Sequence, residues 1–92
     1  MRSRLWLEHD MERFFFHLTS THDTPDLEGA ELADLEAARC HAVTMIADVL
    51  CKNPRAYWEA EIYRVTVTDR NRLILFTVEM ISTDAPSVAK RK

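Results

Sequence analysis

The side chains of this sequence that could bind a transition metal or act as a nucleophile are its histidines and cysteines. They are His9, His17, His22, His41, Cys40 and Cys51. A structural zinc site usually draws its ligands from closely spaced pairs such as Cys-x-x-Cys or His-x3-His. None of these residues has that spacing, and they fall in an N-terminal extension, a strand, a loop and a helix. The sequence therefore predicts no metal site and no cofactor.

A cysteine nucleophile needs a thiolate produced by a helix N-terminus or a neighbouring base. Cys40 and Cys51 fall in one predicted helix, and at 100° per residue both point away from its apolar stripe. They are about 16 Å apart along the helix axis at 1.5 Å per residue, whereas a disulfide requires Cα atoms within about 7 Å. We expect two free thiols, which suit a reducing compartment and a cytoplasmic location.

Carboxylates crowd the segment from residue 23 to residue 36. They are Asp23, Asp26, Glu28, Glu31, Asp34 and Glu36. Two carboxylates that act as general acid and base need a pocket that separates their proton affinities, and a domain with one helix on one sheet seldom encloses one. Gly29 is the only glycine, so no glycine-rich phosphate loop exists. The segment is predicted to be a solvated connection in which Gly29 supplies a positive φ, and the chain is predicted not to be an enzyme.

The clearest predicted element is a helix from about Asp34 to Lys52. Asp34 is a suitable N-cap, and Glu36 complements the helix dipole in the first turn. The pair Asn53-Pro54 ends the helix, because the residue before a proline is disfavoured in the helical region. One apolar stripe has the spacing of a buried helix face and contains Leu35, Ala38, Ala42, Met45, Ile46, Val49 and Leu50.

Three segments alternate as β-strands do. Residues 12–20 place Phe14, Phe16 and Leu18 on one face, and Phe15, His17 and Thr19 on the other. Residues 61–68 and 73–80 form a hairpin around a turn at residues 69–72, in which Asn71 is expected to be left-handed. The predicted fold is α+β, a small antiparallel sheet of three to four strands with one helix on one face, in the order β-(β)-α-β-β. The optional strand is at Glu31-Leu32.

Length and charge set the remaining limits. The chain has 92 residues, 47% of them hydrophobic, and a formal net charge of −3. It has room for one core, and it has no general attraction to nucleic-acid backbones or anionic membranes. We expect an extension over residues 1–10, too short in its apolar part for a signal peptide. A single domain is expected over residues 11–81, followed by a disordered basic tail over residues 82–92.

Four motifs follow one another along the chain: Arg13-Phe14-Phe15-Phe16-His17, Asp26-Leu27-Glu28-Gly29-Ala30-Glu31-Leu32, Asp34-Leu35-Glu36-Ala37-Ala38-Arg39 with Ala42, and Val65-Thr66-Val67-Thr68-Asp69. Together they resemble a family of short uncharacterised alphaproteobacterial proteins, known only as a domain of unknown function. The likeness covers residues 11–80 and departs at the hairpin turn, where relatives often have glycine. It implies no activity, and it implies that residues 1–10 are an extension or that Met11 is the first residue. A weaker likeness to small antitoxin-type domains is an analogy of fold.

One helix covers one face of such a sheet, so the other face is left open for an interaction. The candidate interaction surface consists of Phe15, His17, Tyr63, Arg64, Arg70 and Arg72. The extension's Leu5-Trp6-Leu7 could fold over this face. Alternatively, two copies could pair by their open faces, by edge strands, or by the helix face with Ala37, Cys40, Thr44 and Ala47. The aromatic side chains could also stack on single-stranded RNA, although basic residues are few.

The interpretation that the sequence favours is a small non-enzymatic binding domain that forms a homodimer. A regulatory protein is a possible further partner, and no membrane is involved. Pairing would add buried surface to a chain with a modest core. The alternative is a nucleic-acid-binding or antitoxin-like regulator that uses the open sheet face or the arginines of the hairpin.

Overall fold

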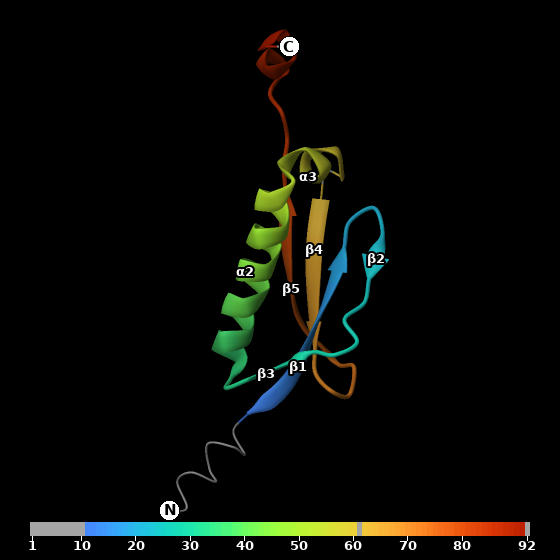
Figure 1. Ribbon diagram of the computed structural model, residues 1–92, viewed down its shortest axis with the longest axis vertical. Coiled ribbons are helices and arrows are strands. Elements are labelled where there is room, and N and C mark those ends of the chain that lie inside the picture. The colour runs from blue at the N-terminus through green and yellow to red at the C-terminus, as the bar shows by residue number, and fades with distance from the viewer. Residues whose placement is uncertain (1–10, 61, 92) are drawn as a thin grey trace, which may run out of the picture.

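The computed structural model describes residues 11–60 and 62–91, which form an antiparallel sheet with helices on one face (Figure 1). The elements are β1 (Glu12–Thr19), β2 (Asp23–Thr24), β3 (Ala30–Leu32), α2 (Leu35–Lys52), α3 (Pro54–Ala60), β4 (Ile62–Thr68), β5 (Ile74–Ile81) and the 3-10 helix η1 (Pro86–Arg91). The predicted α+β class is confirmed. The described residues form five strands rather than three to four, because the connection after β1 contributes both β2 and β3.

The strands lie in the order β2-β1-β4-β5, and β3 also pairs with β1. In the registers, Phe16 lies opposite Val67, and Val67 lies opposite Phe76. These three side chains share the face beneath α2, and Phe16 and Val67 are buried. Because side chains alternate along a strand, Phe15 and His17 lie on the other face, as predicted.

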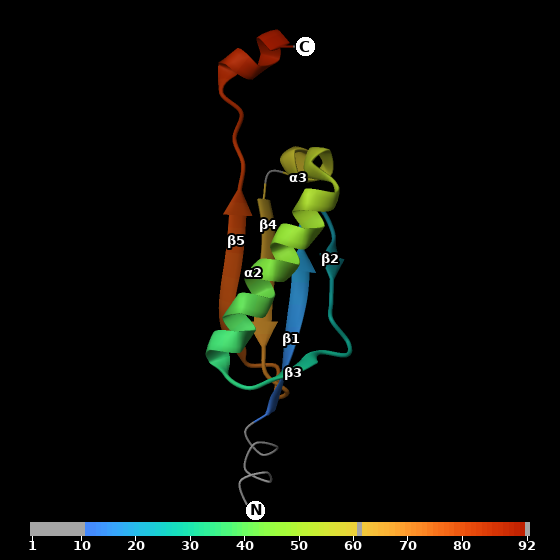
Figure 2. The ribbon, with the colours of Figure 1, turned by 60° about the vertical axis from the view of Figure 1, so that its left-hand side comes forward.

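Helix α2 crosses the sheet diagonally, as Figure 2 shows. Its predicted start is confirmed, because the Oδ1 atom of Asp34 accepts a hydrogen bond from Ala37 N at 2.8 Å. The buried positions fall within the predicted stripe and are Ala38, Ala42, Ile46 and Leu50. Leu35, which was also placed in that stripe, lies in the first turn and is exposed. The two small alanines let the helix backbone approach the sheet closely.

Helix α3 was not predicted. Asn53 leaves the helical region with φ −149°, which ends α2 as expected. Its carbonyl then accepts a hydrogen bond from Tyr57 N at 3.3 Å, and its side-chain oxygen accepts one from Ala56 N at 3.4 Å. Pro54 is compatible with this position, because the first residue of a helix needs no N–H donor. The residues that end α2 therefore also begin α3, which brings Tyr57 into the core.

The hairpin turn differs from the prediction at the left-handed residue. Arg72 has φ 66°, and it is the only residue other than glycine with positive φ among those described. Asp69 organises the turn: its Oδ1 atom accepts hydrogen bonds from Asn71 N at 2.8 Å and Leu73 N at 3.0 Å. Its carbonyl accepts one from Arg72 N at 3.0 Å. A β-turn followed by one left-handed residue is a common three-residue hairpin loop, and it places the strain one residue after Asn71.

The C-terminal segment continues beyond the end of the sheet (Figure 1). Residues Pro86–Arg91, in the tail for which disorder was predicted, form η1, which has no buried residue.

The positive φ predicted for Gly29 is confirmed at 73°. A Cβ atom at this position would lie 2.7 Å from the carbonyl oxygen of Phe14 and 3.0 Å from the ring of Phe15. We therefore predict that Gly29→Ala lowers the free energy of unfolding by about 2 kcal/mol or more, because the left-handed region alone costs about 1–2 kcal/mol. Urea denaturation measures the change.

Gly29→Asn serves as the matched variant, because asparagine tolerates the left-handed region but also carries a Cβ atom. We expect it to be as destabilising as alanine, since the close contact with a backbone oxygen is the same. If asparagine restored wild-type stability, the backbone angle alone would explain the glycine.

Candidate functional site

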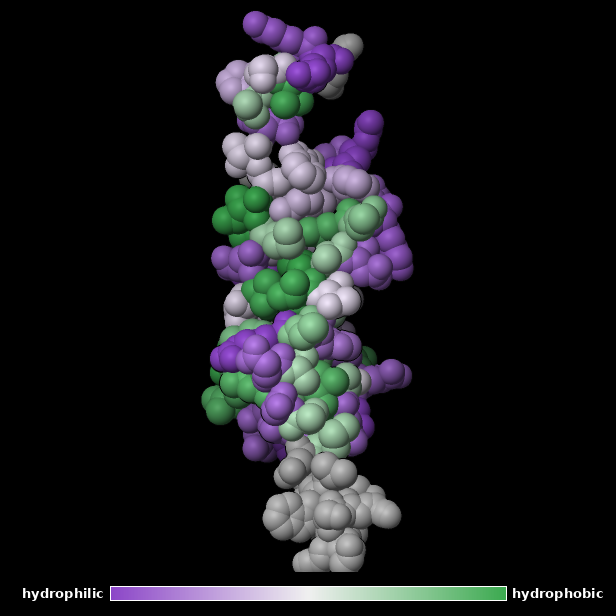
Figure 3. Space-filling model, turned by 90° about the vertical axis from the view of Figure 1, so that its left-hand side faces the viewer, coloured by the Kyte–Doolittle hydropathy of each residue, from purple (hydrophilic) through white to green (hydrophobic). Residues whose placement is uncertain are grey.

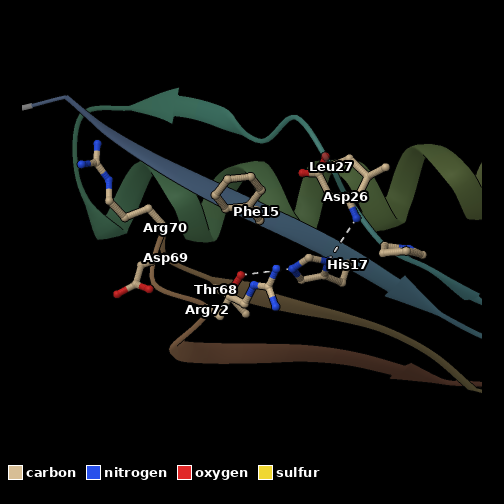
Figure 4. A pocket seen from close by; sticks show the side chains of 9 residues that line it. Phe15, His17, Asp26, Leu27, Thr68, Asp69, Arg70 and Arg72 are labelled. Atoms are coloured by element: carbon tan, nitrogen blue, oxygen red, sulfur yellow. Dashed lines mark hydrogen bonds between the residues drawn. The ribbon is translucent and has the colours of Figure 1, made fainter.

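An open pocket of about 520 Å³ lies on the sheet face that α2 does not cover, at the end where the β4–β5 hairpin turns (Figure 4). We call it the hairpin pocket. It is formed by β1, by the loop between β2 and β3, and by the end of β4 with the turn that follows. Its lining residues are Phe15, His17, Pro25, Asp26, Leu27, Thr68, Asp69, Arg70 and Arg72.

The structure brings together most of the surface residues predicted from the sequence. Phe15, His17, Arg70 and Arg72 all line the hairpin pocket. Arg64 lies outside it and is paired with Glu79, with Nε 2.7 Å from the carboxylate.

The placement of Tyr63 on the open face was wrong. Tyr63 lies opposite Met80 in the sheet, and its ring makes an edge contact with Tyr57 of α3 at 5.4 Å. The alternation explains this position, because Val65 and Val67 are buried beneath α2 and residue 63 must share their face. Tyr63 therefore belongs to the helix-covered side.

His17 is held by hydrogen bonds at both ring nitrogens. The backbone N–H of Asp26 donates to Nδ1 at 3.0 Å, so Nδ1 carries no proton and Nε2 carries one. Nε2 then donates to Oγ1 of Thr68 at 3.1 Å. Because the Thr68 oxygen accepts this bond, its own hydroxyl proton remains free to donate. His17 therefore orients a threonine hydroxyl in the pocket wall.

Asp26 is a structural carboxylate. Its Oδ2 atom accepts a hydrogen bond from Phe16 N at 3.0 Å, and its Oδ1 atom accepts from Glu28 N at 3.1 Å and Gly29 N at 3.0 Å. Burial is the largest single influence on this group and raises its pKa. The backbone donors Phe16, Gly29 and Glu28 together outweigh burial and lower the pKa of Asp26 below its ordinary value. The Asp-x-x-Gly motif thus fixes a turn.

Thr68 was not singled out from the sequence. It lies directly opposite Phe15 across the β1–β4 pairing, and only that register places its hydroxyl beside His17. The alternation of β4 was the available signal, since Thr68 shares the open face with Arg64 and Thr66. Without the register, however, nothing pointed to its partner.

The other residues considered for chemistry are not part of this pocket. Cys40 and Cys51 are exposed free thiols. In the part of the chain that the structure describes, no three His, Cys, Asp or Glu side chains are grouped so that they could hold a metal ion. Within the same residues, no helix is both long enough and apolar enough to cross a bilayer. His9 and the segment Leu5-Trp6-Leu7 lie outside the described residues.

The lowered pKa of Asp26 predicts a pH dependence of stability. A carboxyl whose pKa is lower in the folded than in the unfolded chain stabilises the fold above the unfolded value, about 3.9. This contribution is lost as the pH falls through the folded value. We expect Asp26→Asn to lower stability at neutral pH by about 1–3 kcal/mol, because one or more backbone donors lose their acceptor. The deficit should shrink in acid.

Urea denaturation at neutral pH and near pH 3 measures both parts of this prediction. Asp23→Asn is the control, because Asp23 is exposed and makes no side-chain hydrogen bond with the described residues. It should change stability by less than about 0.5 kcal/mol. Parallel pH curves for wild type and Asp26→Asn would contradict the assignment.

Comparisons with known proteins place this site within a family. A search among curated proteins and a search among solved structures each found no match. A family model described as a domain of unknown function, DUF6894, matches residues 13–82. The match runs from β1 to just beyond β5, includes every residue of the hairpin pocket, and confirms the resemblance to a family of unknown function. The chain therefore belongs to the DUF6894 family.

Proposed function

We propose that this chain is a non-enzymatic binding domain that forms a homodimer through the outer edge of β5. The observation that carries the proposal is the difference between the two edges of the sheet. One edge has its backbone groups paired, and the other is a long, largely apolar strand with nothing described against it.

The edge at β1 is sealed by the chain itself. From β2 to β3 the backbone runs along β1, as Figure 2 shows, pairing first with Leu18 and Thr19 and then with Glu12 to Phe14. Between these two short ladders, the Asp26 carboxylate accepts the hydrogen bond of Phe16 N. A second copy would find few free backbone donors along this edge.

The edge at β5 has little of the protection that proteins usually give to edge strands. Its eight residues, Ile74–Ile81, contain no proline and no lysine, and Glu79 is the only charged residue. Ile74 is 63% exposed and Ile81 is 69% exposed. Edge strands without charges, proline or a covering segment are ready to pair with another strand. The unpaired edge and its apolar ends favour a second β-strand as the occupant.

The flank of α2 next to β5 also exposes an apolar side chain. The His41 ring contacts Phe16 of β1 at 4.5 Å. Val43 lies two residues later, about 200° around the helix, and so faces the opposite flank, toward β5. Val43 is 53% exposed and Met80 of β5 is 38% exposed. Figure 3 shows hydrophobic side chains among the polar ones on this side of the molecule. A second sheet joined at β5 would cover both residues.

One antiparallel register fits the side chains best. Centring the twofold axis on Val78 would pair it with the partner's Val78, and would pair Phe76 with the partner's Met80 on the helix side. On the open side, Thr77 would face the partner's Glu79. Centring on Glu79 would oppose two carboxylates, which is unfavourable. The pairing of β4 with β5 shifts register between Phe76 and Ile74. Centring on Thr77 would extend the new ladder through this irregular stretch as far as Ile74.

The described chemistry supports binding rather than catalysis. Both ring nitrogens of His17 are engaged, and the Asp26 carboxylate accepts hydrogen bonds from three backbone donors. The free thiols Cys40 and Cys51 are exposed, which suits a reducing compartment such as the cytoplasm. A dimer of this kind would present both open sheet faces on one side, where a regulatory protein could bind.

A nucleic-acid-binding or antitoxin-like function is the second candidate. Phe15 with Arg70 and Arg72 favours it, since aromatic rings and arginines bind single strands. However, Arg64 is paired with Glu79, and the chain carries a net charge of −3. Polyanion binding requires a longer basic surface than this hairpin offers.

We predict that the full chain is a dimer and that Thr77→Glu weakens it. Thr77→Glu would place two pairs of like charges across the proposed twofold, which should raise the dimer dissociation constant by about tenfold. Native mass spectrometry and light scattering over a concentration series measure this change. Thr77 is exposed, so the variant should remain folded, as circular dichroism can verify.

Thr77→Lys is the matched control, because a lysine would face the partner's Glu79 and should preserve or strengthen the dimer. If the wild-type chain is monomeric at every concentration, homodimer formation is wrong. If both variants dimerise as the wild type does, the interface lies elsewhere than in this register of β5.

A further inference from the structure

We propose that the hairpin pocket binds a small organic anion, with an oxyanion held by Arg72 and the hydroxyl of Thr68, while Arg70 lines the pocket beyond Phe15. The oxyanion would be a phosphate or a carboxylate, attached to a compact apolar body that packs against Phe15. This inference is independent of homodimer formation at β5, because the pocket and that edge share no residue.

The first support is that the two arginines have no acidic partner among the described residues. The ion pairs in that part of the chain are Arg13–Glu31, Arg39–Glu36, Lys52–Asp48 and Arg64–Glu79. Arg70 and Arg72 take part in none of these pairs, yet both line one pocket. Guanidinium groups offer paired N–H donors that match the geometry of carboxylate and phosphate oxygens.

The two carboxylates of the pocket are engaged elsewhere. Asp26 accepts hydrogen bonds from the backbone of β1 and of its own turn, and Asp69 accepts them from Asn71 N and Leu73 N. Figure 4 draws the Asp69 carboxylate turned outward, away from His17. The formal charges of two aspartates and two arginines cancel, so binding would depend on direct hydrogen bonds more than on long-range attraction.

The second support is the backbone of Arg72. Its φ of 66° lies in the left-handed region, which is unfavourable for a residue with a Cβ atom and suits glycine. Strained residues of this kind often occur at binding sites, where the side chain is needed. The one such residue described in this chain places an arginine side chain in the lining of the pocket.

The third support is the oriented hydroxyl of Thr68. Thr68 is 8% exposed, and its hydroxyl oxygen accepts a hydrogen bond from His17, which in turn accepts one from the backbone of Asp26. Among the described residues, the bond with His17 is the one side-chain hydrogen bond found for the Thr68 hydroxyl oxygen, and in that bond the oxygen is the acceptor. A chain of hydrogen bonds that ends in a free donor is suited to an acceptor atom of a ligand.

The remaining wall of the pocket is apolar. Phe15, Pro25 and Leu27 all line the pocket, and Leu27 is 86% exposed. In Figure 4 the ring of Phe15 lies between Arg70 and Leu27. A ligand with one anionic end and one flat or apolar end would contact both walls. Pockets for small molecules commonly combine apolar walls with a few polar groups that fix the orientation.

The test titrates the full chain with phenyl phosphate and, separately, with benzoate, followed by calorimetry and by NMR shifts. Phenol is the control compound, because it has the ring without the oxyanion. The informative variant is Arg72→Gly, which should weaken binding by about tenfold or more through the lost charged hydrogen bonds. The same variant should unfold at a higher urea concentration than the wild type, because glycine relieves the left-handed strain.

Arg55→Gln is the matched control, since Arg55 is an exposed arginine of α3 outside the pocket. The proposal is supported if phenyl phosphate or benzoate binds saturably, phenol does not, and only Arg72→Gly loses the binding. Which compound binds then distinguishes phosphate from carboxylate ligands. The proposal is overturned if neither compound binds the folded protein saturably. It is also overturned if the Arg72→Gly and Arg55→Gln variants bind the compound with the same affinity. It is also overturned if only a single-stranded oligonucleotide binds, with steep salt dependence.

Discussion

The hydrogen bonds of the Asp26 carboxylate hold the edge of β1, the turn that follows and the wall of the hairpin pocket together. One carboxylate oxygen accepts a hydrogen bond from Phe16 N in β1, and the other accepts hydrogen bonds from Glu28 N and Gly29 N in the following turn. The loop is thereby fixed along the edge of β1. The backbone N–H of Asp26 donates a hydrogen bond to Nδ1 of His17, and His17 in turn orients the hydroxyl of Thr68. A single residue thus links an edge, a turn and a pocket wall.

This arrangement gives the two edges of the sheet different roles. The loop fixed by Asp26 uses the free backbone groups of β1, so that edge has little left for a partner. Helix α2 contacts β1 through His41 and Phe16, which leaves its other flank and the outer edge of β5 uncovered by described residues. A domain with one long helix cannot cover a whole sheet, and the position of that helix decides which strand is left for association.

The features that could be predicted from the sequence are those that depend on residues close together in the chain. Asp34 capped its helix as expected, and the alternation of β1 placed Phe14 and Phe16 in the core. Helix α3 was missed because Pro54 was taken as the end of a helix, whereas proline is equally suited to begin one. Asn71 was predicted to adopt the left-handed conformation because asparagine tolerates positive φ. The hydrogen bonds of Asp69 instead fixed the turn and moved that conformation to Arg72.

The pocket itself could not be derived from local patterns. His17 and Thr68 are separated by 51 residues, and they meet only because β1 and β4 pair in one particular register. A shift of one residue would turn every side chain of a strand to the other face. Tyr63 is a different case, because the alternation of β4 places it on the same face as the buried Val65 and Val67, beneath the helices.

Net charge is a poor guide to what such a pocket binds. The value of −3 argues against polyanions, which sense charge over a Debye length of about 8–10 Å in ordinary salt. A small anion in the proposed site would be held at hydrogen-bond distance, where a guanidinium group and a hydroxyl outweigh charges farther away. Arg70 and Arg72 lie on one short turn, but in Figure 4 the Arg70 side chain is directed away from Thr68, so Arg72 is the arginine placed to act with the hydroxyl. The strained backbone of Arg72 is then the feature that links the hairpin fold to recognition of an anion.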